Sequence, residues 1–526
     1  MLTLFTSCIR RREVEGGIYI RGYTVVRSAE ASENIVKAAK LVKKEIRENL
    51  RVGVSLAKDS RSEREYEILI GDTERAESTA ALEKLKSASE KRAFSITFTE
   101  NKIVIVGHSD DDVVLGVKSF INKFVKTSDE KGVIWVEPGY SCAERTGNVL
   151  YFSEDLDAVV IERSADIFHP RTNEGEFSYG KIIKLEHNGE NNGLLFATHE
   201  TLDGFPPPVF CSKDDGRSWE IVSRVKDELN TECLVGYQSY IYELPDDVGE
   251  YKKGTLLFAG CSRTDNKTVM VLYASTDLGR TWKTLCNVDV GGGYNKDQWI
   301  SDGLWEPVLM YENNRLYCFY SDERENGVGD AHTGGHCQKL VYKYTADMKS
   351  WSDARECVAS ENPKHRPGMV SLAKMGNGKW ALAYELCGSD DKVGCQIYLK
   401  LADTLDSWEV ADLGTPVLDK DGKGIGSAPA IAWTPRGGDC GTLFITAHHS
   451  DASKTGCDLF VSFDYGKTFV TINNPISVAR SSDGVKCGYS PGFYVDESGD
   501  LYYVNNPEAY KGMENERFVF VKIKCY

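Results

Sequence analysis

The sequence predicts an all-β six-bladed β-propeller preceded by a small α/β sandwich domain. Two observations lead to this prediction. Near residue 140 the pattern changes from alternating helix and strand signals to short β-rich runs separated by Gly, Asp and Asn turns. Within the β-rich part, one turn motif recurs along the chain. We therefore expect an accessory α/β domain in residues 1–140 and a propeller domain in residues 141–526.

The first domain contains helix and strand patterns in alternation. Residues 66–72 predict a buried strand that ends in a turn, and residues 93–97 and 103–106 predict two strands joined by a tight turn. Residues 111–124 predict a helix whose acidic first turn suits the helix dipole. Residues 32–49 predict another helix, because apolar residues recur at helical spacing at Ile35, Ala38, Ala39, Val42 and Ile46.

The recurring motif of the second domain is the Asp box, Ser-x-Asp-x-Gly-x-Thr-Trp. Full copies span residues 212–219, 275–282 and 462–469, the last with Phe in place of Trp, and degenerate copies span 347–351 and 403–408. In such a turn the carboxylate accepts backbone N–H groups and the Gly adopts a positive φ, so we expect a structural role. The separation of about 60 residues fits one four-stranded blade per box, which leaves a sixth, closing blade without a box. The box aspartates are Asp214, Asp277, Asp347, Asp403 and Asp464.

Composition excludes several classes of protein and of partner. With 41% hydrophobic and 27% charged residues, the chain is not intrinsically disordered. A net charge of −16 disfavours nucleic acid as a partner. No apolar run has the length of a membrane span. Because the short apolar start precedes three arginines instead of following them, a cytoplasmic location is favoured, with secretion or a lipid anchor as the alternative if the true start lies upstream.

The 15 cysteines are scattered, and no two are spaced as C-x2-C. An odd number leaves at least one without a partner in the chain. This usage favours reduced thiols over a disulfide framework and predicts no zinc site. We expect no metal and no cofactor.

Two glutamates outside the Asp boxes are the candidate catalytic residues. Glu306 has apolar neighbours in the chain, and burial beside Trp305 would raise its pKa, as a general acid requires. Glu385 ends the apolar run 380–384. Two glutamates from different blades that face one cavity would provide the carboxyl pair needed to cleave a glycosidic bond. The alternative is that each glutamate pairs with an arginine inside the propeller.

Aromatic, arginine and aspartate side chains near these glutamates are candidate substrate contacts. Aromatic rings can stack on sugars, and arginines can bind hydroxyls or carboxylates. The alternatives are an aromatic residue of the core and an arginine paired with a structural aspartate. The candidates are Arg171, Tyr237, Trp305, Tyr320, Asp322, Arg324, Arg366 and Tyr489.

Both parts of the chain resemble known families. Residues 1–140 resemble the non-catalytic domain that precedes the barrel of β-N-acetylhexosaminidases, on Ile68-Leu69-Ile70-Gly71 and the paired strands before a final helix. Residues 150–508 resemble the exo-acting arabinanases of glycoside hydrolase family 93, through an ordered series of short stretches. The series includes Leu304-Trp305-Glu306-Pro307, Tyr320-Ser321-Asp322-Glu323-Arg324, Arg366-Pro367-Gly368-Met369, Tyr384-Glu385 and Tyr489-Ser490-Pro491.

The second resemblance implies a sialidase-like six-bladed propeller that releases arabinobiose from the non-reducing end of α-1,5-linked arabinan with retention. It implies an oligosaccharide or polysaccharide as partner, Glu306 as the acid/base and Glu385 as the nucleophile. The chain departs from the family in its N-terminal domain and in an insertion at residues 325–335.

Two alternatives remain at this stage. A sialidase would share the boxes and blades, but it needs an Arg triad, and Phe168-His169-Pro170-Arg171 stands where Phe-Arg-Ile-Pro is usual. A non-catalytic glycan-binding propeller would need neither Glu306 nor Glu385. The sequence does not indicate the oligomeric state.

Overall fold

The structure is a computed structural model in which the chain divides into two compact units. The main segment of the first is Met1–Tyr151, and the second contains Phe152–Pro435 and Asp439–Cys525. The described residues are 17–87, 94–126, 128, 130–136, 141–144, 159–163, 177–201, 206–295, 300–324, 338–391, 393–437, 439–451, 458–474, 476, 488–506 and 517–523.

A six-stranded mixed sheet forms the centre of the first unit, with strand order β3-β2-β4-β6-β5-β8. Strands β3, β2, β4 and β6 are parallel, and β5 and β8 are antiparallel to their neighbours. The boundary expected at residue 140 precedes β8, which completes this sheet. The strands are β2 (Thr24–Arg27), β3 (Ser55–Lys58), β4 (Glu67–Ile70), β5 (Phe94–Phe98), β6 (Lys102–Gly107) and β8 (Ser141–Glu144), with a separate pair β1 (Ile18–Tyr19) and β7 (Val133–Ile134).

Helices cover both faces of this sheet, so the predicted small α/β region is present. The helices are α1 (Glu33–Asn49), α2 (Ala76–Ser87), α3 (Asp110–Phe120) and the π-helix η1 (Ile121–Val125) that continues α3. Alternate strand residues point to opposite faces. On one face Ile68 packs with α1 and α3, and on the other Leu69 packs with Ala81 and Leu85 of α2.

Helix α1 begins where the sequence predicts. The Ser32 hydroxyl accepts the Ile35 backbone N–H at 3.3 Å and caps the helix. The five apolar residues that predicted this helix are all buried. Helix α2 escaped prediction because it buries only Ser78, Ala81 and Leu85 along its length, too few for a clear periodic pattern. The resemblance of this unit to the hexosaminidase accessory domain stays a prediction.

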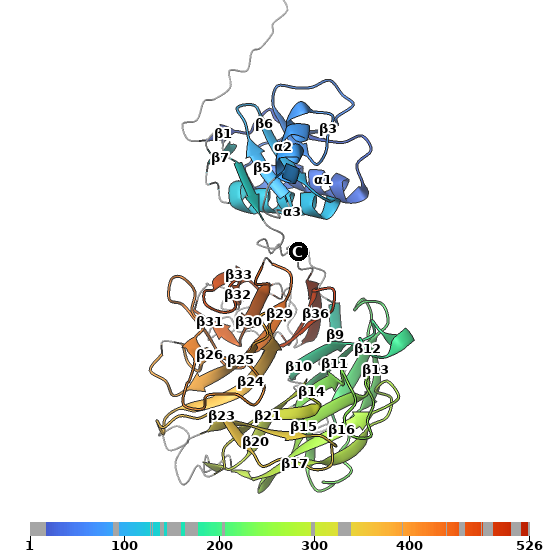
Figure 1. The fold of residues 1–526 in the computed structure, drawn as a ribbon, viewed down its shortest axis with the longest axis vertical. Helices are drawn as coiled ribbons and strands as arrows, with labels where there is room; N and C mark the ends of the chain where they lie inside the picture. The colour runs from blue at the N-terminus through green and yellow to red at the C-terminus, as the bar shows by residue number, and fades with distance from the viewer. Residues whose placement is uncertain are drawn as a thin grey trace, which may run out of the picture. The chain divides into compact units, whose positions relative to one another are not determined.

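The second unit is a six-bladed β-propeller, as predicted (Figure 1). Each blade is an antiparallel sheet whose first strand lies innermost, and the inner strands of successive blades contact one another until β34 returns to β10. The blades are, in order, β10 (Phe177–Lys184), β11 (Leu195–Thr201), β12 (Pro208–Ser212) and β13 (Glu220–Arg224); β14 (Leu234–Glu243), β15 (Leu256–Thr264), β16 (Lys267–Ser275) and β17 (Lys283–Gly292); β20 (Leu304–Glu312), β21 (Arg315–Asp322), β22 (Lys339–Thr345) and β23 (Arg355–Val358); β24 (Arg366–Lys374), β25 (Trp380–Cys387), β26 (Gln396–Ala402) and β27 (Thr415–Pro416); β29 (Ala430–Thr434), β30 (Thr442–Thr446), β32 (Asp458–Ser462) and β33 (Val470–Asn473); and β34 (Gly492–Val495), β35 (Leu501–Asn505), β36 (Arg517–Ile523) and β9 (Val159–Arg163).

The sixth blade closes the ring by joining the two ends of the propeller. Its outermost strand is β9, from the start of this unit, and its other strands come from the end of the chain. Short strands extend the fourth blade and form one extra hairpin. These are β28 (Ile425–Gly426), β31 (His449–Ser450), β18 (Tyr294–Asn295) and β19 (Ile300–Ser301).

The five Asp boxes lie in the first five blades, each after the third strand, and the sixth blade has none. In the first box the Asp214 carboxylate accepts the Ser218 backbone N–H at 2.9 Å and the Ser218 hydroxyl at 2.6 Å, which lowers the Asp214 pKa to about 2. Gly216 has a φ of +86°, and a Cβ there would lie 2.0 Å from the Phe520 ring of the sixth blade. The box is therefore a structural turn that packs one blade against its neighbour.

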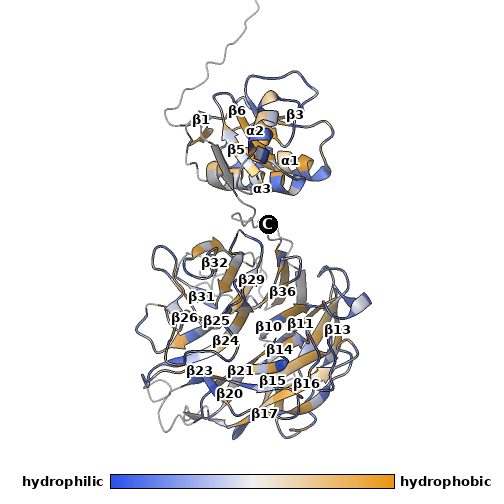
Figure 2. Ribbon diagram, viewed as in Figure 1, coloured by the Kyte–Doolittle hydropathy of each residue, from blue (hydrophilic) through white to orange (hydrophobic). Residues whose placement is uncertain are grey.

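Hydrophobic residues concentrate on the strands, and hydrophilic residues on the connecting loops (Figure 2). The interfaces between blades are filled by large aromatic residues; Tyr317, Tyr384 and Tyr502 are each fully buried. Among the described residues, no helix has the length and apolar character needed to span a membrane.

Candidate active site

Six residues with a left-handed backbone surround the axis of the propeller, one from each blade. Each lies near the start of an innermost strand, and in the first four blades it occupies a β-bulge of that strand. A positive φ is costly for a residue with a side chain, and such strain gathers at functional sites. The six are Tyr179 (φ 52°), Gln238 (57°), Glu306 (61°), Met369 (56°), Ala428 (51°) and Ser490 (57°).

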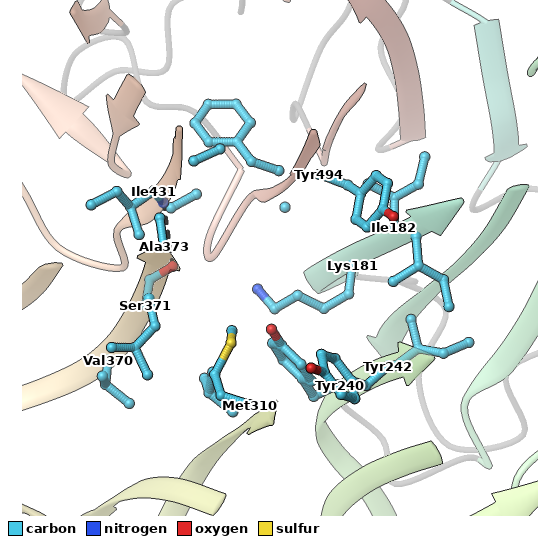
Figure 3. Close-up of a pocket in the computed structure, with 18 of the residues that line it drawn as sticks. Lys181, Ile182, Tyr240, Tyr242, Met310, Val370, Ser371, Ala373, Ile431 and Tyr494 are labelled. Atoms are coloured by element: carbon cyan, nitrogen blue, oxygen red, sulfur yellow. Dashed lines mark hydrogen bonds between the residues drawn. The ribbon is translucent and has the colours of Figure 1, made fainter. Parts of the chain in front are cut away.

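A cavity of ≈ 340 Å³ runs along this axis and is lined by the innermost strands of all six blades. Figure 3 shows Lys181 reaching into the cavity opposite Ser371, with Tyr240 and Met310 beside it. The Lys181 ammonium donates to the Ser490 hydroxyl at 3.2 Å and to a backbone carbonyl at 3.3 Å. Burial lowers the Lys181 pKa to about 7. Glu306 lines the same cavity.

The Glu306 carboxylate is held by neutral donors. The Ser321 hydroxyl donates to Oε2 at 2.5 Å, and Tyr179 Oη and Gln238 Nε2 approach Oε1 at 3.4 Å each. Gln238 also accepts the Glu306 backbone N–H at 3.0 Å, so one amide side chain fixes both ends of the residue. Within the described part of the chain no lysine or arginine forms an ion pair with this carboxylate.

These surroundings favour the protonated form of Glu306. Burial raises its pKa to about 7, and the negative charges of Glu385 and Glu323 act in the same direction, while the Ser321 hydrogen bond opposes them. A carboxyl with a pKa near neutrality can both give up and take back a proton under working conditions.

Glu385 approaches the same region from the fourth blade. It lies on β25 opposite Gly368, is 9% exposed, and accepts the Ala428 backbone N–H at 2.9 Å. Burial raises its pKa, whereas the Ala428 N–H, the Ser427 hydroxyl and the Arg366 charge lower it. Because the charge of Glu385 helps to raise the pKa of Glu306, the two carboxyls share one electrostatic environment.

Another carboxyl, that of Glu200 on β11, is buried and supports Glu306 indirectly. It accepts the Gln238 backbone N–H at 2.6 Å and so fixes the residue that clamps Glu306. Burial raises the Glu200 pKa to about 8, and the Glu306 charge contributes to the rise. Glu200 acts on Glu306 only through Gln238 and is therefore a positioning residue.

Arg366 and Trp305 are joined through Glu323. Arg366 pairs with Glu323 and donates to Gln338 at 2.8 Å. The other oxygen of Glu323 accepts the Trp305 indole N–H at 2.8 Å. The Arg366 charge also lowers the pKa of Glu385, so this group links the third blade to the fourth at the site.

Tyr320, Asp322 and Arg324 form an ion-pair network with Asp289. Arg324 contacts Asp322 at 2.7 Å and Asp289 at 2.9 Å, and the Tyr320 hydroxyl donates to Asp289 at 2.6 Å. Tyr320 is fully buried. The expectation that its ring contacts substrate is therefore corrected, because a ring without exposed surface cannot stack on a sugar.

Tyr489 lies close enough to both candidate catalytic residues for their charges to act on it. Its ring packs edge-on against Tyr179, with centroids 5.7 Å apart, and against His448 at 5.2 Å. Burial raises the Tyr489 pKa, and the charges of both Glu385 and Glu306 raise it further.

The other two candidates are Tyr237 and Arg171. Tyr237 is 4% exposed, and the guanidinium of Arg263 lies 3.7 Å from its ring centroid, so one ring face is covered. Arg171 lies outside the described residues.

Sequence reasoning missed Tyr179, Gln238 and Glu200. The first two occupy, in their own blades, the bulge position that Glu306 occupies in the third blade. An alignment of the inner strands blade by blade would have identified them. Glu200 had no motif to mark it, because its role depends on a contact with the next blade.

One disulfide, Cys387–Cys395, is present among the described residues. The expectation of reduced thiols is therefore wrong for this pair. The two residues lie on β25 and directly before β26, and a cross-strand pair eight positions apart has no spacing signature. Seven other described cysteines are free: Cys211, Cys233, Cys261, Cys286, Cys318, Cys357 and Cys440.

Solved structures similar to this chain include an α-L-arabinanase and an α-L-arabinofuranosidase. An α-L-arabinanase of Penicillium chrysogenum, complexed with arabinobiose, is 30% identical over 70% of this chain and 97% of its own, with a TM-score of 0.57. The GH93 α-L-arabinofuranosidase of Fusarium graminearum, also with arabinobiose, is 26% identical over 69% of this chain and 98% of its own, with a TM-score of 0.57. No family model and no curated protein matches the chain.

Proposed function

This chain belongs to glycoside hydrolase family 93, and we propose that it is a retaining exo-glycosidase that releases arabinobiose from α-1,5-linked arabinan or arabino-oligosaccharides. It is a glycoside hydrolase, and the similarity supports arabinan-type substrates. The relatives with arabinobiose bound support a disaccharide product. The observation that carries the chemistry is a pair of carboxyls on adjacent blades, the half-buried Glu306 and the buried Glu385, both with raised pKa values.

In this proposal Glu306 is the acid/base and Glu385 is the nucleophile. Burial raises the Glu306 pKa to about 7, and its partners among the described residues are neutral donors. Burial raises the Glu385 pKa as well, but a backbone N–H and the Arg366 cation, which Glu306 lacks, oppose that rise and support its carboxylate. Nucleophilic attack needs the charged form and leaving-group protonation needs the neutral form, so the surroundings match the two roles.

The reaction proceeds in two displacements. Glu385 attacks the anomeric carbon while Glu306 gives its proton to the departing glycosidic oxygen, which leaves a glycosyl ester on Glu385. Glu306, now a carboxylate, takes a proton from water, and the resulting hydroxide cleaves the ester with retention. The scheme requires the two carboxyls to lie about 5–5.5 Å apart.

Trp305, Arg366 and Tyr489 are the proposed substrate contacts. Trp305 and Arg366 are partly exposed. Glu323 accepts the indole N–H of Trp305 and forms an ion pair with Arg366. The charges of both carboxyls act on Tyr489. The guanidinium of Arg324 forms ion pairs with Asp322 and Asp289. This pairing argues against a sialidase-type role in which Arg324 would bind a substrate carboxylate.

Product analysis on linear α-1,5-arabino-oligosaccharides tests this function. Wild type should release arabinobiose, and Glu306→Ala and Glu385→Ala should each lose this activity. Glu312→Gln is the matched control, because Glu312 lies on the same strand as Glu306 but binds Trp380 and Lys374. Its activity should persist. Absence of turnover by folded wild type would refute the substrate assignment.

Azide distinguishes the two roles when an aryl arabinobioside with a good leaving group is the substrate. In Glu306→Ala the glycosyl ester still forms, so azide should give a glycosyl azide of retained configuration. In Glu385→Ala azide should occupy the place of the nucleophile and give the inverted product. The opposite pattern would exchange the two roles.

A further inference from the structure

The Cys387–Cys395 disulfide lies beside the proposed nucleophile. Residues two apart on a strand face the same side, so Cys387 and Glu385 share one face of β25. The Cys387 sulfur lies 3.7 Å from Glu385 Oε1. Cys395 stands opposite Cys387 with its Cα 3.8 Å away. One ligand atom from each of the three residues lies within 4.8 Å of the others.

This geometry matches the ligand set of a zinc ion. Zinc binds thiolate sulfur at roughly 2.3 Å and carboxylate oxygen at roughly 2.0–2.2 Å in a tetrahedron, which separates a bound sulfur from a bound oxygen by roughly 3.6 Å. The sulfur–oxygen distance at Glu385 is 3.7 Å. Both cysteines are half-buried, so a small reductant and a metal ion can reach them.

We propose that reduction of the Cys387–Cys395 disulfide creates a site for Zn²⁺ formed by the two thiolates and the Glu385 carboxylate. A dithiol reductant supplies two electrons to the S–S bond and becomes a cyclic disulfide, and its two protons pass to the new thiols. Zn²⁺ then displaces these two protons as it binds. The fourth ligand is water.

Occupancy of this site inhibits the enzyme, a consequence that rests on the proposed function. A carboxylate bound to zinc cannot attack an anomeric carbon. Reduction also affects the support of Glu385, because the Cys395 carbonyl accepts the Ser427 N–H at 2.9 Å, and the next residue, Ala428, donates to Glu385. The oxidised enzyme is unaffected by zinc, whereas the reduced enzyme loses activity as zinc binds.

Cobalt titration of the full-length protein tests the site without substrate. Protein reduced with dithiothreitol and desalted without oxygen is titrated with Co²⁺, and thiolate-to-cobalt charge-transfer absorption is recorded. Reduced wild type should bind one Co²⁺ more than oxidised wild type, and Zn²⁺ should displace it. The double variant Cys387→Ser/Cys395→Ser should lose this extra site. Cys440→Ser, which removes a free thiol elsewhere, should retain it.

Equal cobalt absorption in reduced wild type and the double variant would overturn the proposal. Because that variant can fail to fold, Glu385→Gln provides a second test that leaves both cysteines in place. Its affinity for Zn²⁺ after reduction should fall at least about tenfold, since even supporting partners of metal ligands are worth 10–100-fold. Unchanged affinity would remove Glu385 from the site.

Activity measurements separate this inference from the proposed function. Zn²⁺ should inhibit arabinobiose release by the reduced enzyme only, and a chelator should restore it. Absence of turnover in every state would refute the proposed substrate while the cobalt result still stands. Turnover that zinc does not affect after reduction would refute the inhibitory role alone.

Discussion

Replacing Glu306 by glutamine is expected to stabilise the propeller at neutral and alkaline pH. In the fold the Glu306 pKa rises from its ordinary value of 4.5 to about 7. The unfolded chain loses this proton near pH 4.5 and the folded chain only near pH 7, so wild type loses stability as the pH rises between these values. The rise corresponds to about 3 kcal/mol, at about 1.4 kcal/mol for each pKa unit. Glutamine has no charge and avoids this loss.

Other ionisable groups face Glu306 and remain in the variant, so their contributions largely cancel in the comparison. They come from several strands and connections around it. These groups are Tyr179 on β10, Glu200 on β11, Glu323 after β21, Glu385 on β25 and Tyr489 before β34.

Urea unfolding of the propeller at pH 4.5 and pH 8 measures the effect. The free energy of unfolding of Glu306→Gln, relative to wild type, should increase by about 3 kcal/mol between the two pH values. Glu312→Gln is the control on the same strand. Hydrogen bonds and Lys374 lower the Glu312 pKa below 4.5, so the pH dependence of this variant lies below pH 4.5 and its stability relative to wild type should change little between pH 4.5 and pH 8. If Glu306→Gln behaved like the control, Glu306 would be a structural ion-pair partner and not a proton donor.

Three further variants test separate parts of the structure. Glu200→Gln replaces a carboxyl whose pKa is about 8, and which is therefore largely protonated at pH 7, by an amide whose oxygen can still accept the Gln238 N–H, so the alkaline limb of the pH profile of kcat/KM should stay in place; a limb that moved to lower pH would mean that Glu200 acts by its charge and not by positioning Gln238. Gly216→Ala should lower the free energy of unfolding by about 2 kcal/mol or more, measured by urea, because its Cβ meets the Phe520 ring at 2.0 Å and its φ is +86°; an unchanged midpoint would count against this packing. Glu67→Gln should cost the α/β unit about 3–5 kcal/mol, measured by thermal unfolding, because it leaves the buried Arg75 guanidinium without its carboxylate, and kcat should stay unchanged.

The sequence predicted the parts of the fold that repeat or that follow a periodic pattern. The Asp boxes are contiguous and carry fixed residue types, so they identified five blades and implied the sixth. Helix α1 has a cap at Ser32 and a full apolar stripe, and it begins at the predicted position. Helix α2 has neither feature and was missed.

At the site, the sequence identified residue types but not their partners. Glu306 and Glu385 were recognised from their apolar surroundings and from family resemblance. The engagement of Arg324 by Asp289 was invisible, because these residues are 35 positions apart and lie on different blades. Glu200 was invisible for the same reason.

The six left-handed residues explain why sequence motifs do not identify the residues around the propeller axis. Each costs roughly 1–2 kcal/mol, so six cost on the order of 10 kcal/mol, comparable with the net stability of a domain. This cost can be offset by the buried aromatic interfaces between blades and by the Asp boxes. These stabilising contacts lie on other strands and turns and do not involve the six strained residues. The six positions carry six different residue types, which include a charged residue, Glu306, and a small apolar residue, Ala428. They share only their backbone conformation. Because each position is selected for a different side chain, no sequence motif repeats at the six positions. The site is found instead by comparing the register of the inner strands blade by blade.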